Sequence, residues 1–166
     1  MSAAPNQSAL EAQARELGYR LRERGWRMAA AESCTGGWIA QCVTATAGSS
    51  DWFECGFVTY SNAAKIALLG VEPLLIERHG AVSIETAAAM AAGALRVAVV
   101  DMAVSVTGVA GPGGGSPERP VGTVCFGFAV AGRAVVTARE VFPGDRQEVR
   151  ARSVAYALDR LSALLD

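Results

Sequence analysis

Hydrophobic residues recur along the chain with two different spacings, which together predict helices and strands. Between Asn6 and Arg24 apolar residues return every three or four positions, the spacing of one helix face, and Gly25 is a typical helix end. Asp145 and Glu148 form the sequence pattern of a capping box that opens a C-terminal helix. Similar signals predict further helices from the glycine pair at 36–37 to residue 44, and over residues 61–68, 72–78, 83–98 and 145–165.

Shorter apolar runs between these helices predict five strands. We expect them at residues 26–31, 53–60, 102–107, 121–130 and 134–142. Only residues 131–133 separate the last two, which is the length of a hairpin turn. Strands that alternate with helices and end in a hairpin predict an α/β fold: a single three-layer domain over residues 1–166, with a mixed β-sheet and a C-terminal β-hairpin followed by a helix. Residues 1–5 are expected to be disordered.

The composition narrows the range of functions. About half of the 166 residues are hydrophobic and the formal net charge is −1. The chain therefore has enough apolar material for one core, and it lacks the basic excess typical of a nucleic-acid-binding protein. Its longest apolar run, residues 97–109, is interrupted by Asp101 and Ser105 and is too short to span a bilayer. We expect no nucleic-acid partner and no membrane role.

The cysteines and the amino terminus indicate a cytoplasmic protein. No C-x-x-C pair and no histidine at zinc spacing occurs among the four cysteines, which are Cys34, Cys42, Cys55 and Cys125. We therefore expect reduced thiols and no metal site. No basic-then-apolar signal segment precedes the first predicted helix. We expect a homodimer, because symmetric dimers are the commonest assemblies of soluble proteins.

The first candidate for chemistry is the segment 33–37, Ser-Cys-Thr-Gly-Gly, between a predicted strand and a predicted helix. Amide N–H groups at a helix start carry partial positive charge, and glycines let a ligand approach the main chain. Such groups could hold an anion, or an oxyanion that develops beside the Ser33 hydroxyl. The simpler interpretation is that Ser33 or Thr35 only caps the helix.

The second candidate is Lys65, the only lysine of the chain, which follows Tyr60 and the predicted helix cap Ser61. Near a helix start the helix dipole disfavours a protonated amine, and partial burial would lower the pKa of this lysine further. A neutral amine can take the proton of a serine hydroxyl, and Tyr60 could relay that proton or orient the amine. A solvated lysine on a short helix is the ordinary alternative.

The third candidate is the glycine-rich segment 107–116, directly after a predicted buried strand. Its backbone donors and hydroxyl groups suit a phosphate or a ribose, although a flexible connector has the same composition. Arg146 and Arg150 lie one helical turn apart, where they could reach a substrate phosphate or form surface ion pairs, and neither alternative is favoured. His79, the only histidine, lies at a predicted helix end and is a weak catalytic candidate.

Seven motifs, in order along the chain, together resemble the CinA C-terminal domain family. They are residues 31–37, 48–50, 56–62 with Lys65, 79–83, 108–112 with 114–115, 120–124, and 144–146 with 149–150. The resemblance extends from about Arg24 to the end of the chain. It implies hydrolysis of the carboxamide of nicotinamide mononucleotide to nicotinate mononucleotide and ammonia, within pyridine-nucleotide recycling and without a metal or cofactor.

The resemblance also implies roles for individual residues. Ser33 would be the nucleophile and Lys65 the base. Tyr60, chosen from its place before Lys65, is the third predicted catalytic residue. The predicted substrate-binding residues are Cys34, Thr35, Gly36, Gly37, Ser50, Thr107, Gly108, Gly111, Gly113, Arg146 and Arg150.

Two other functions are compatible with the sequence. One is a non-catalytic nucleotide-sensing or partner-binding domain of a competence- or damage-inducible protein. The other is a hydrolase of the same fold that acts on a different amide. The joint presence of Ser33, Tyr60 and Lys65 favours catalysis over binding alone.

Overall fold

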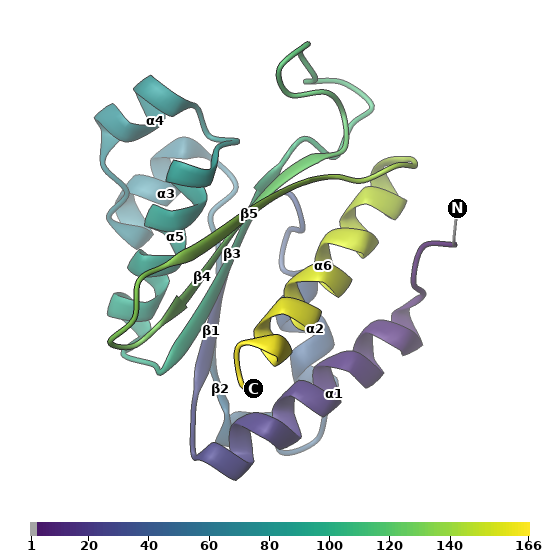
Figure 1. Ribbon diagram of the computed structural model, residues 1–166, viewed down its shortest axis with the longest axis vertical. Coiled ribbons are helices and arrows are strands. Elements are labelled where there is room, and N and C mark those ends of the chain that lie inside the picture. Colours follow the sequence, from purple (N-terminus) through teal and green to yellow (C-terminus); the bar gives the residue numbers. More distant parts are fainter. Residues whose placement is uncertain (1–2) are drawn as a thin grey trace.

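A five-stranded mixed β-sheet forms the middle layer of the protein, whose residues 3–166 are described by a computed structural model (Figure 1). The strands lie in the order β2-β1-β3-β4-β5. β1 is parallel to both of its neighbours, whereas β4 is antiparallel to β3 and β5. The carboxyl ends of the first three strands therefore meet at one edge of the sheet. The strands are β1 (Met28–Glu32), β2 (Phe53–Val58), β3 (Met102–Gly108), β4 (Thr123–Val130) and β5 (Val136–Val141).

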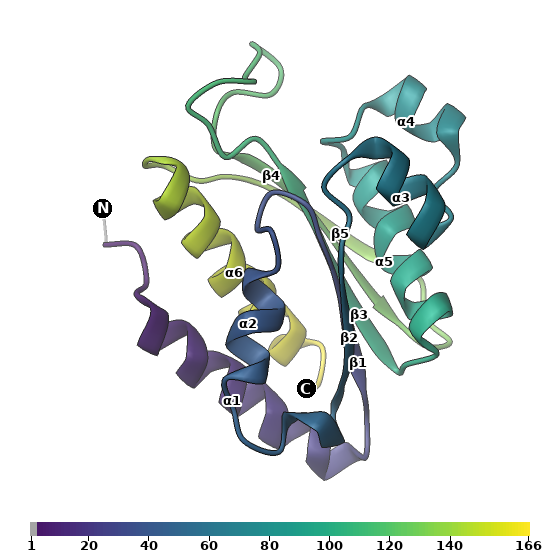
Figure 2. The same ribbon diagram turned by 180° about the vertical axis from the view of Figure 1, so that it is seen from behind.

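Helices cover both faces of this sheet (Figure 1 and Figure 2). One face carries α1 (Gln7–Arg24), α2 (Trp38–Thr44) and α6 (Arg146–Ala163), and the other carries α3 (Asn62–Leu69), α4 (Pro73–His79) and α5 (Ile84–Ala98). A short 3-10 helix, η1 (Ser49–Asp51), joins α2 to β2. The predicted three-layer α/β fold with a mixed sheet, a terminal hairpin and a final helix is confirmed. Within residues 3–166, no helix is long and apolar enough to cross a membrane.

The two faces of the sheet are packed differently. Beneath α1, α2 and α6, the large side chains of Trp52, Phe126 and Phe128 are at most 1% exposed and belong to the larger core cluster. On the opposite face α5 approaches β4 closely: a Cβ added to Gly127 would lie only 2.4 Å from the Ala87 carbonyl oxygen. Only small residues fit at that contact.

Local sequence signals predict the helix starts well. The side chains of Asn6, Ser61, Ser83 and Asp145 each accept a hydrogen bond from the first turn of α1, α3, α5 and α6, respectively. Asp145 and Glu148 form the predicted capping box. These caps depend on residues three positions apart, so their pattern is visible without the fold.

Strand starts are predicted less well than helix starts. β1 begins two residues later than predicted, because the N–H of Trp26 still donates to the Leu21 carbonyl at the end of α1. β4 also begins two residues later than predicted, because Gly122 has a φ of 96° and forms a turn. The remaining element bounds agree with the predictions to within two residues.

The expected disorder of residues 1–5 concerns the segment before α1. Residues 1 and 2 lie outside the described part of the chain. Residues 3–5 are described, and Ala4 packs against the larger core cluster.

Candidate active site

Ser33 and Lys65 meet at the carboxyl edge of the sheet, from positions far apart in the sequence. Ser33 directly follows β1, and its N–H donates to the Val106 carbonyl of β3 at 2.9 Å. Lys65 lies on the buried face of α3, whose start is fixed by the Ser61 cap. Lys65 Nζ lies 3.1 Å from Ser33 Oγ, within hydrogen-bond distance. A strand end and a helix of the adjacent layer thus contribute to one buried contact.

Three oxygen atoms surround the amine of Lys65. Besides Ser33 Oγ, these are the carbonyl oxygens of Thr59 at 2.9 Å and Tyr60 at 3.3 Å. Lys65 is only 1% exposed, and this burial lowers its pKa below the ordinary lysine value. An uncharged amine can donate its two N–H groups to the two carbonyls and direct its lone pair at the Ser33 hydroxyl. This arrangement suits a general base.

A cavity of about 200 Å³ opens beside this pair. It lies at the carboxyl ends of β1 and β3, the usual ligand position in open α/β sheets. The predicted site residues that line it are Ser33, Cys34, Tyr60, Lys65, Thr107, Gly108 and Arg146. Sequence reasoning missed Asn62, Ala81, Val82 and Ala110, which also line it. Asn62 was detectable as a polar neighbour of a helix cap, but small apolar loop residues carry no chemical signal.

Glu32 is a buried carboxyl group at the end of β1, and sequence reasoning overlooked it. It accepts hydrogen bonds from the Thr35 hydroxyl at 2.6 Å and from the amides of Gly37, Ile39 and Ala40 at 2.9–3.2 Å. One side chain therefore satisfies most of the N–H groups that the start of α2 would leave unpaired. A charged residue at the end of an otherwise apolar strand was the signal that could have revealed it.

This capping decides which amides of the segment 33–37 are available to a substrate. The Gly37 amide donates to Glu32, and the Gly36 amide donates to the Ser33 carbonyl at 3.0 Å. These two glycine amides are therefore already used within the protein. The amides of Cys34 and Thr35 donate to no oxygen atom of residues 3–166. Thr35 is fully buried and does not line the cavity, so the Cys34 amide is the candidate for holding an oxyanion.

Replacing Glu32 by alanine is expected to destabilise the protein by about 3–5 kcal/mol, because several buried donors lose their acceptor at once. Urea unfolding followed by circular dichroism would show a lower midpoint. Glu54→Ala is the matched control, since Glu54 forms a surface ion pair with Arg27 whose loss should cost less than about 1 kcal/mol. Equal effects of the two substitutions would contradict the role assigned to Glu32.

The thiol of Cys34 is not suited to be a second nucleophile. Cys34 is 7% exposed, and burial raises the pKa of its thiol to about 12. A thiol that stays protonated near neutral pH reacts poorly. Cys34 therefore contributes a cavity wall and a main-chain amide.

Tyr60 contacts Lys65 through its main chain. Its carbonyl accepts from Lys65, whereas its phenol is exposed and accepts a hydrogen bond from Arg146 Nη2 at 3.1 Å. Arg146 Nη1 donates to the Gly111 carbonyl at 2.7 Å. Of the two predicted roles of Tyr60, these contacts support orienting the amine, and they do not link its phenol to the Ser33 proton. Arg146 lines the cavity.

Arg150 lies behind the segment 33–37 and does not line the cavity. Its Nε donates to the Cys34 carbonyl at 3.1 Å and its Nη2 to the Thr35 carbonyl at 3.0 Å. Its guanidinium lies over the Trp38 ring, 5.4 Å from the ring centre. Neither predicted alternative for Arg150, a phosphate contact or a surface ion pair, describes these contacts.

The glycine-rich segment contributes only its first part to the cavity. The Thr107 hydroxyl donates to the Ala81 carbonyl at 2.8 Å. Gly108 also lines the cavity, and a Cβ added to this residue would lie 2.8 Å from the Thr123 carbonyl oxygen. Gly111 offers its carbonyl to Arg146 instead, and Gly113 is exposed with open space around it. The predicted cradle therefore starts at Thr107 and Gly108, and the structure does not place Gly111 and Gly113 in the cavity wall.

A larger hollow of about 560 Å³ adjoins the cavity. Ala110 and Arg146 line both spaces. The other residues around the hollow are Pro112, Val121, Gly144, Asp145 and Gln147. A ligand too long for the first cavity therefore has room to extend past Arg146.

Ser50 lies at the opposite end of the sheet. It is exposed in η1, which precedes β2, and the neighbouring Trp52 carbonyl accepts a hydrogen bond from Met28 at the start of β1. Ser33 follows the other end of β1. Ser50 is not among the residues that line the cavity.

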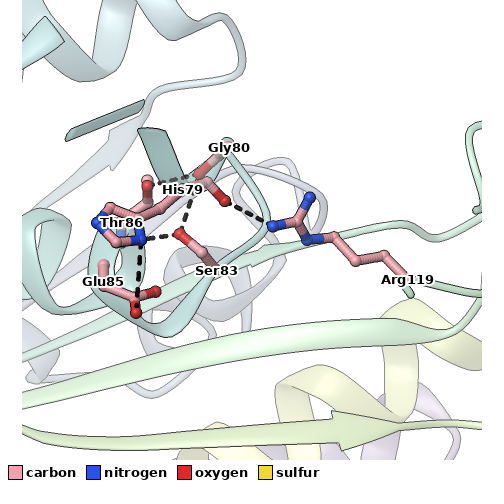
Figure 3. A network of polar contacts seen from close by, with 6 residues as sticks. All are labelled: His79, Gly80, Ser83, Glu85, Thr86 and Arg119. Carbon is pink, nitrogen blue, oxygen red and sulfur yellow. Dashed lines mark hydrogen bonds and ion pairs between the residues drawn. The ribbon is translucent and has the colours of Figure 1, made fainter. Parts of the chain in front are cut away.

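His79 belongs to a polar network that shapes the cavity wall from outside (Figure 3). Its Nδ1 lies 3.6 Å from Glu85, and its carbonyl accepts a hydrogen bond from Arg119 at 2.6 Å. The hydroxyls of Ser83 and Thr86 both donate to the Gly80 carbonyl. The network fixes the turn between α4 and α5 that supplies Ala81 and Val82 to the cavity, while the His79 ring stays outside it.

The fold and the site together define a class: three-layer α/β domains with a buried serine–lysine pair in a cavity at the carboxyl ends of parallel strands. The chain belongs to the CinA C-terminal domain family, whose sequence model matches residues 10–165.

Known proteins support this assignment. The chain is 53% identical over 146 residues to the nicotinamide-nucleotide amidohydrolase PncC of Escherichia coli K12, covering 88% of each chain. It is 54% identical over 143 residues to the PncC of Enterobacter agglomerans, covering 86% of this chain and 87% of the relative. The crystal structure of the competence/damage inducible protein CihA from Agrobacterium tumefaciens matches all of both chains with a TM-score of 0.93 and 42% identity.

Proposed function

We propose that this protein hydrolyses the carboxamide of nicotinamide mononucleotide to nicotinate mononucleotide and ammonia, as a step of pyridine-nucleotide recycling. The observation that carries the proposal is the contact of Lys65 Nζ with Ser33 Oγ at 3.1 Å, in an environment that lowers the pKa of the amine. The amidohydrolase relatives, similar over most of their length, support the same reaction.

The first half of the reaction forms an ester. Lys65 takes the Ser33 proton while Ser33 Oγ attacks the carboxamide carbon, and the Cys34 amide holds the resulting oxyanion. The protonated amine then gives its proton to the amide nitrogen, the C–N bond breaks, and ammonia leaves. Ser33 is now esterified by the nicotinate group.

The second half releases the acid. Lys65 takes a proton from water as the water oxygen attacks the ester carbon, and the oxyanion again lies at the Cys34 amide. The C–O bond to Ser33 breaks, Lys65 returns the proton to Ser33 Oγ, and the carboxylic acid product departs. The same buried amine thus serves as base and acid in both halves.

The shape of the site supports a nucleotide substrate. The cavity of about 200 Å³ suits a pyridine ring with its carboxamide at Ser33. The ribose then extends toward Arg146, which lines both this cavity and the adjoining hollow. A guanidinium at that position is a suitable ligand for the 5′-phosphate.

The decisive experiment measures ammonia release from nicotinamide mononucleotide, its riboside and free nicotinamide. We expect the highest kcat/KM for the mononucleotide. Arg146→Met should raise KM for the mononucleotide about 10- to 100-fold, because a charged contact to the phosphate is lost. The same substitution should change kcat/KM for the riboside much less, since the riboside has no phosphate.

Two outcomes would contradict this function. Failure of the wild-type protein to release ammonia from the mononucleotide, while calorimetry shows binding, would favour the non-catalytic nucleotide-binding alternative. Faster turnover of another amide would favour the alternative hydrolase.

A cytoplasmic location and a homodimer belong to the same proposal. All four cysteines are free thiols, which a reducing cytoplasm maintains. The dimer rests on the general frequency of two-fold assemblies, and sedimentation analysis would test it.

A further inference from the structure

A second cavity, of about 290 Å³, adjoins the catalytic one on the face of the sheet that α5 covers. Val82 lines both cavities, so they share the turn between α4 and α5 as a wall. Thr107 of β3, Cys125 of β4 and Arg139 of β5 are paired across the sheet. Because cross-strand partners point to the same face, Thr107 reaches the catalytic cavity, while Cys125 and Arg139 reach the second one. The proposed amidohydrolase reaction does not use this second cavity.

Two guanidinium groups from separate segments line the second cavity. Arg119 comes from the loop before β4, and its Nη2 donates to the His79 carbonyl at 2.6 Å (Figure 3). Arg139 comes from β5, and its Nη2 donates to the Glu118 carbonyl. Neither arginine forms an ion pair with a carboxylate of residues 3–166. Each guanidinium has five N–H donors, so most donors of this pair are available to an anion.

The start of α5 adds main-chain donors to the same cavity. Ile84 and Glu85 line it, and their amides donate to no oxygen atom of residues 3–166. Amides at a helix start carry partial positive charge, which favours a negative group nearby. Donors from α5, from β5 and from the loop before β4 therefore converge on one space.

A buried polar group without a partner lies at the wall of this cavity. Cys125 is only 1% exposed, and its thiol forms no hydrogen bond with residues 3–166. Burial raises the pKa of this thiol, so the thiol stays protonated near neutral pH and can donate weakly. Buried polar groups are normally satisfied by the protein, by water or by a ligand. The unpartnered thiol therefore points to a polar occupant of the cavity.

Glu85 also brings one carboxylate to the cavity. This carboxylate lies 3.6 Å from His79 Nδ1 (Figure 3), and the two guanidiniums outweigh its charge. It weakens the attraction for a bare anion, but it can accept a hydrogen bond from a hydroxyl group. The combination suits an anionic group that is carried by a small molecule with hydroxyl groups.

We propose that this cavity is a second binding site, distinct from the catalytic one, for the phosphate group of a small hydroxylated ligand. The guanidiniums of Arg119 and Arg139 and the amides at the start of α5 bind the phosphate, and Glu85 accepts a hydrogen bond from a ligand hydroxyl. A phosphate fits this set of donors because it offers several acceptor oxygens to groups that arrive from different directions. The inference goes beyond the proposed amidohydrolase function and does not depend on it.

The test follows the ¹⁵N-labelled protein by NMR during titration with inorganic phosphate at constant ionic strength. We expect saturable shifts of the Ile84 and Glu85 amides and of the Arg139 Nε–H, with a Kd of roughly 1 mM. Arg139→Met should weaken this binding about 10- to 100-fold, because a charge-assisted contact is lost. The variant should fold normally, since the only hydrogen bond of the Arg139 side chain is to a loop carbonyl, that of Glu118.

Two control variants separate this site from general attraction and from the catalytic cavity. Arg133→Met removes an exposed guanidinium of the nearby hairpin turn that does not line the second cavity, so binding should be unchanged. Arg146→Met removes the proposed phosphate contact of the catalytic cavity and should also leave the Ile84 and Glu85 shifts unchanged.

A second titration, with glycerol 3-phosphate, tests the role of Glu85. This ester has hydroxyl groups and should bind about 10-fold more tightly than inorganic phosphate, because Glu85 accepts one of them. Glu85→Ala should abolish that difference. Equal affinities in the wild-type protein would overturn the role of Glu85 and assign the cavity to the free ion.

Three outcomes would overturn the site itself. These are the absence of saturable shifts at Ile84 and Glu85, shifts confined to residues of the catalytic cavity, and equal weakening by Arg133→Met and Arg139→Met. No measurement in this series involves ammonia release. Failure of the proposed function would therefore leave this inference intact, and failure of this inference would leave the proposed function intact.

Discussion

Ser33→Ala is expected to lower kcat for ammonia release by about 10⁶-fold, because loss of the nucleophile in serine hydrolases has an effect of that order. The variant should fold normally. Among residues 3–166, the Ser33 hydroxyl is hydrogen-bonded to the Lys65 amine alone, and that amine keeps its two carbonyl partners when the hydroxyl is removed. Ammonia release, the urea midpoint and the calorimetric affinity for nicotinamide mononucleotide should be measured together.

Ser8→Ala is the control for this substitution, since Ser8 is exposed on α1 and far from the cavity in the sequence. It should match the wild-type protein in all three measurements. An active Ser33→Ala variant would refute Ser33 as nucleophile and leave direct attack by water as the mechanism to examine. Binding of the nucleotide that survives in Ser33→Ala would separate recognition from chemistry.

Lys65→Met is expected to lower kcat by about 10²- to 10⁴-fold, the usual contribution of a general base. Methionine has a similar length and suits a buried position, but it has no proton acceptor. Lys65→Arg keeps the positive charge and should be similarly inactive, because arginine does not deprotonate in proteins. Near-normal turnover of Lys65→Arg would exclude the general-base role.

The pH dependence of kcat/KM in the wild-type protein also tests Lys65 as the general base, because the lowered pKa predicts the direction of the change. Burial lowers the pKa of Lys65, so the amine is uncharged at a lower pH than an exposed lysine would be. The reactive form is the uncharged one. We therefore expect kcat/KM to rise as the pH increases through the pKa of Lys65, and to be low at pH values below that pKa. The acidic fall should disappear from the residual activity of Lys65→Met, and its persistence there would assign the titration to another group.

Much of the fold is encoded in short-range patterns. Asn6, Ser61, Ser83 and Asp145 cap helices because each side chain reaches an amide only a few residues away. The order of strands and helices, with a final hairpin, predicts the three-layer domain. The single lysine could be selected by its residue type, and Ser33 by its position between a predicted strand and a glycine pair at a helix start. Their roles followed from the family resemblance.

The sequence did not predict which candidate residues line the cavity and which form hydrogen bonds within the protein. Arg146 and Arg150 have equivalent positions in the sequence pattern, yet one lines the cavity and the other holds main-chain carbonyls behind it. The glycine amides predicted to bind substrate are used within the protein, one of them by Glu32. Ser50 belongs to a matching motif but lies near the start of β1, whereas Ser33 follows the end of that strand.

The sequence by itself determined the elements, their caps, the fold class and the two side chains proposed for chemistry, since these follow from periodicity and from residue type. Only the tertiary structure decided which amides of the segment 33–37 form hydrogen bonds within the protein, which arginine reaches the cavity and how the amine of Lys65 is held. The physical reason is that hydrogen-bond partners such as Arg150 and Cys34, or Lys65 and Ser33, are brought together by the packing of helices against the sheet. A short-range sequence pattern does not predict such contacts between residues far apart in the chain.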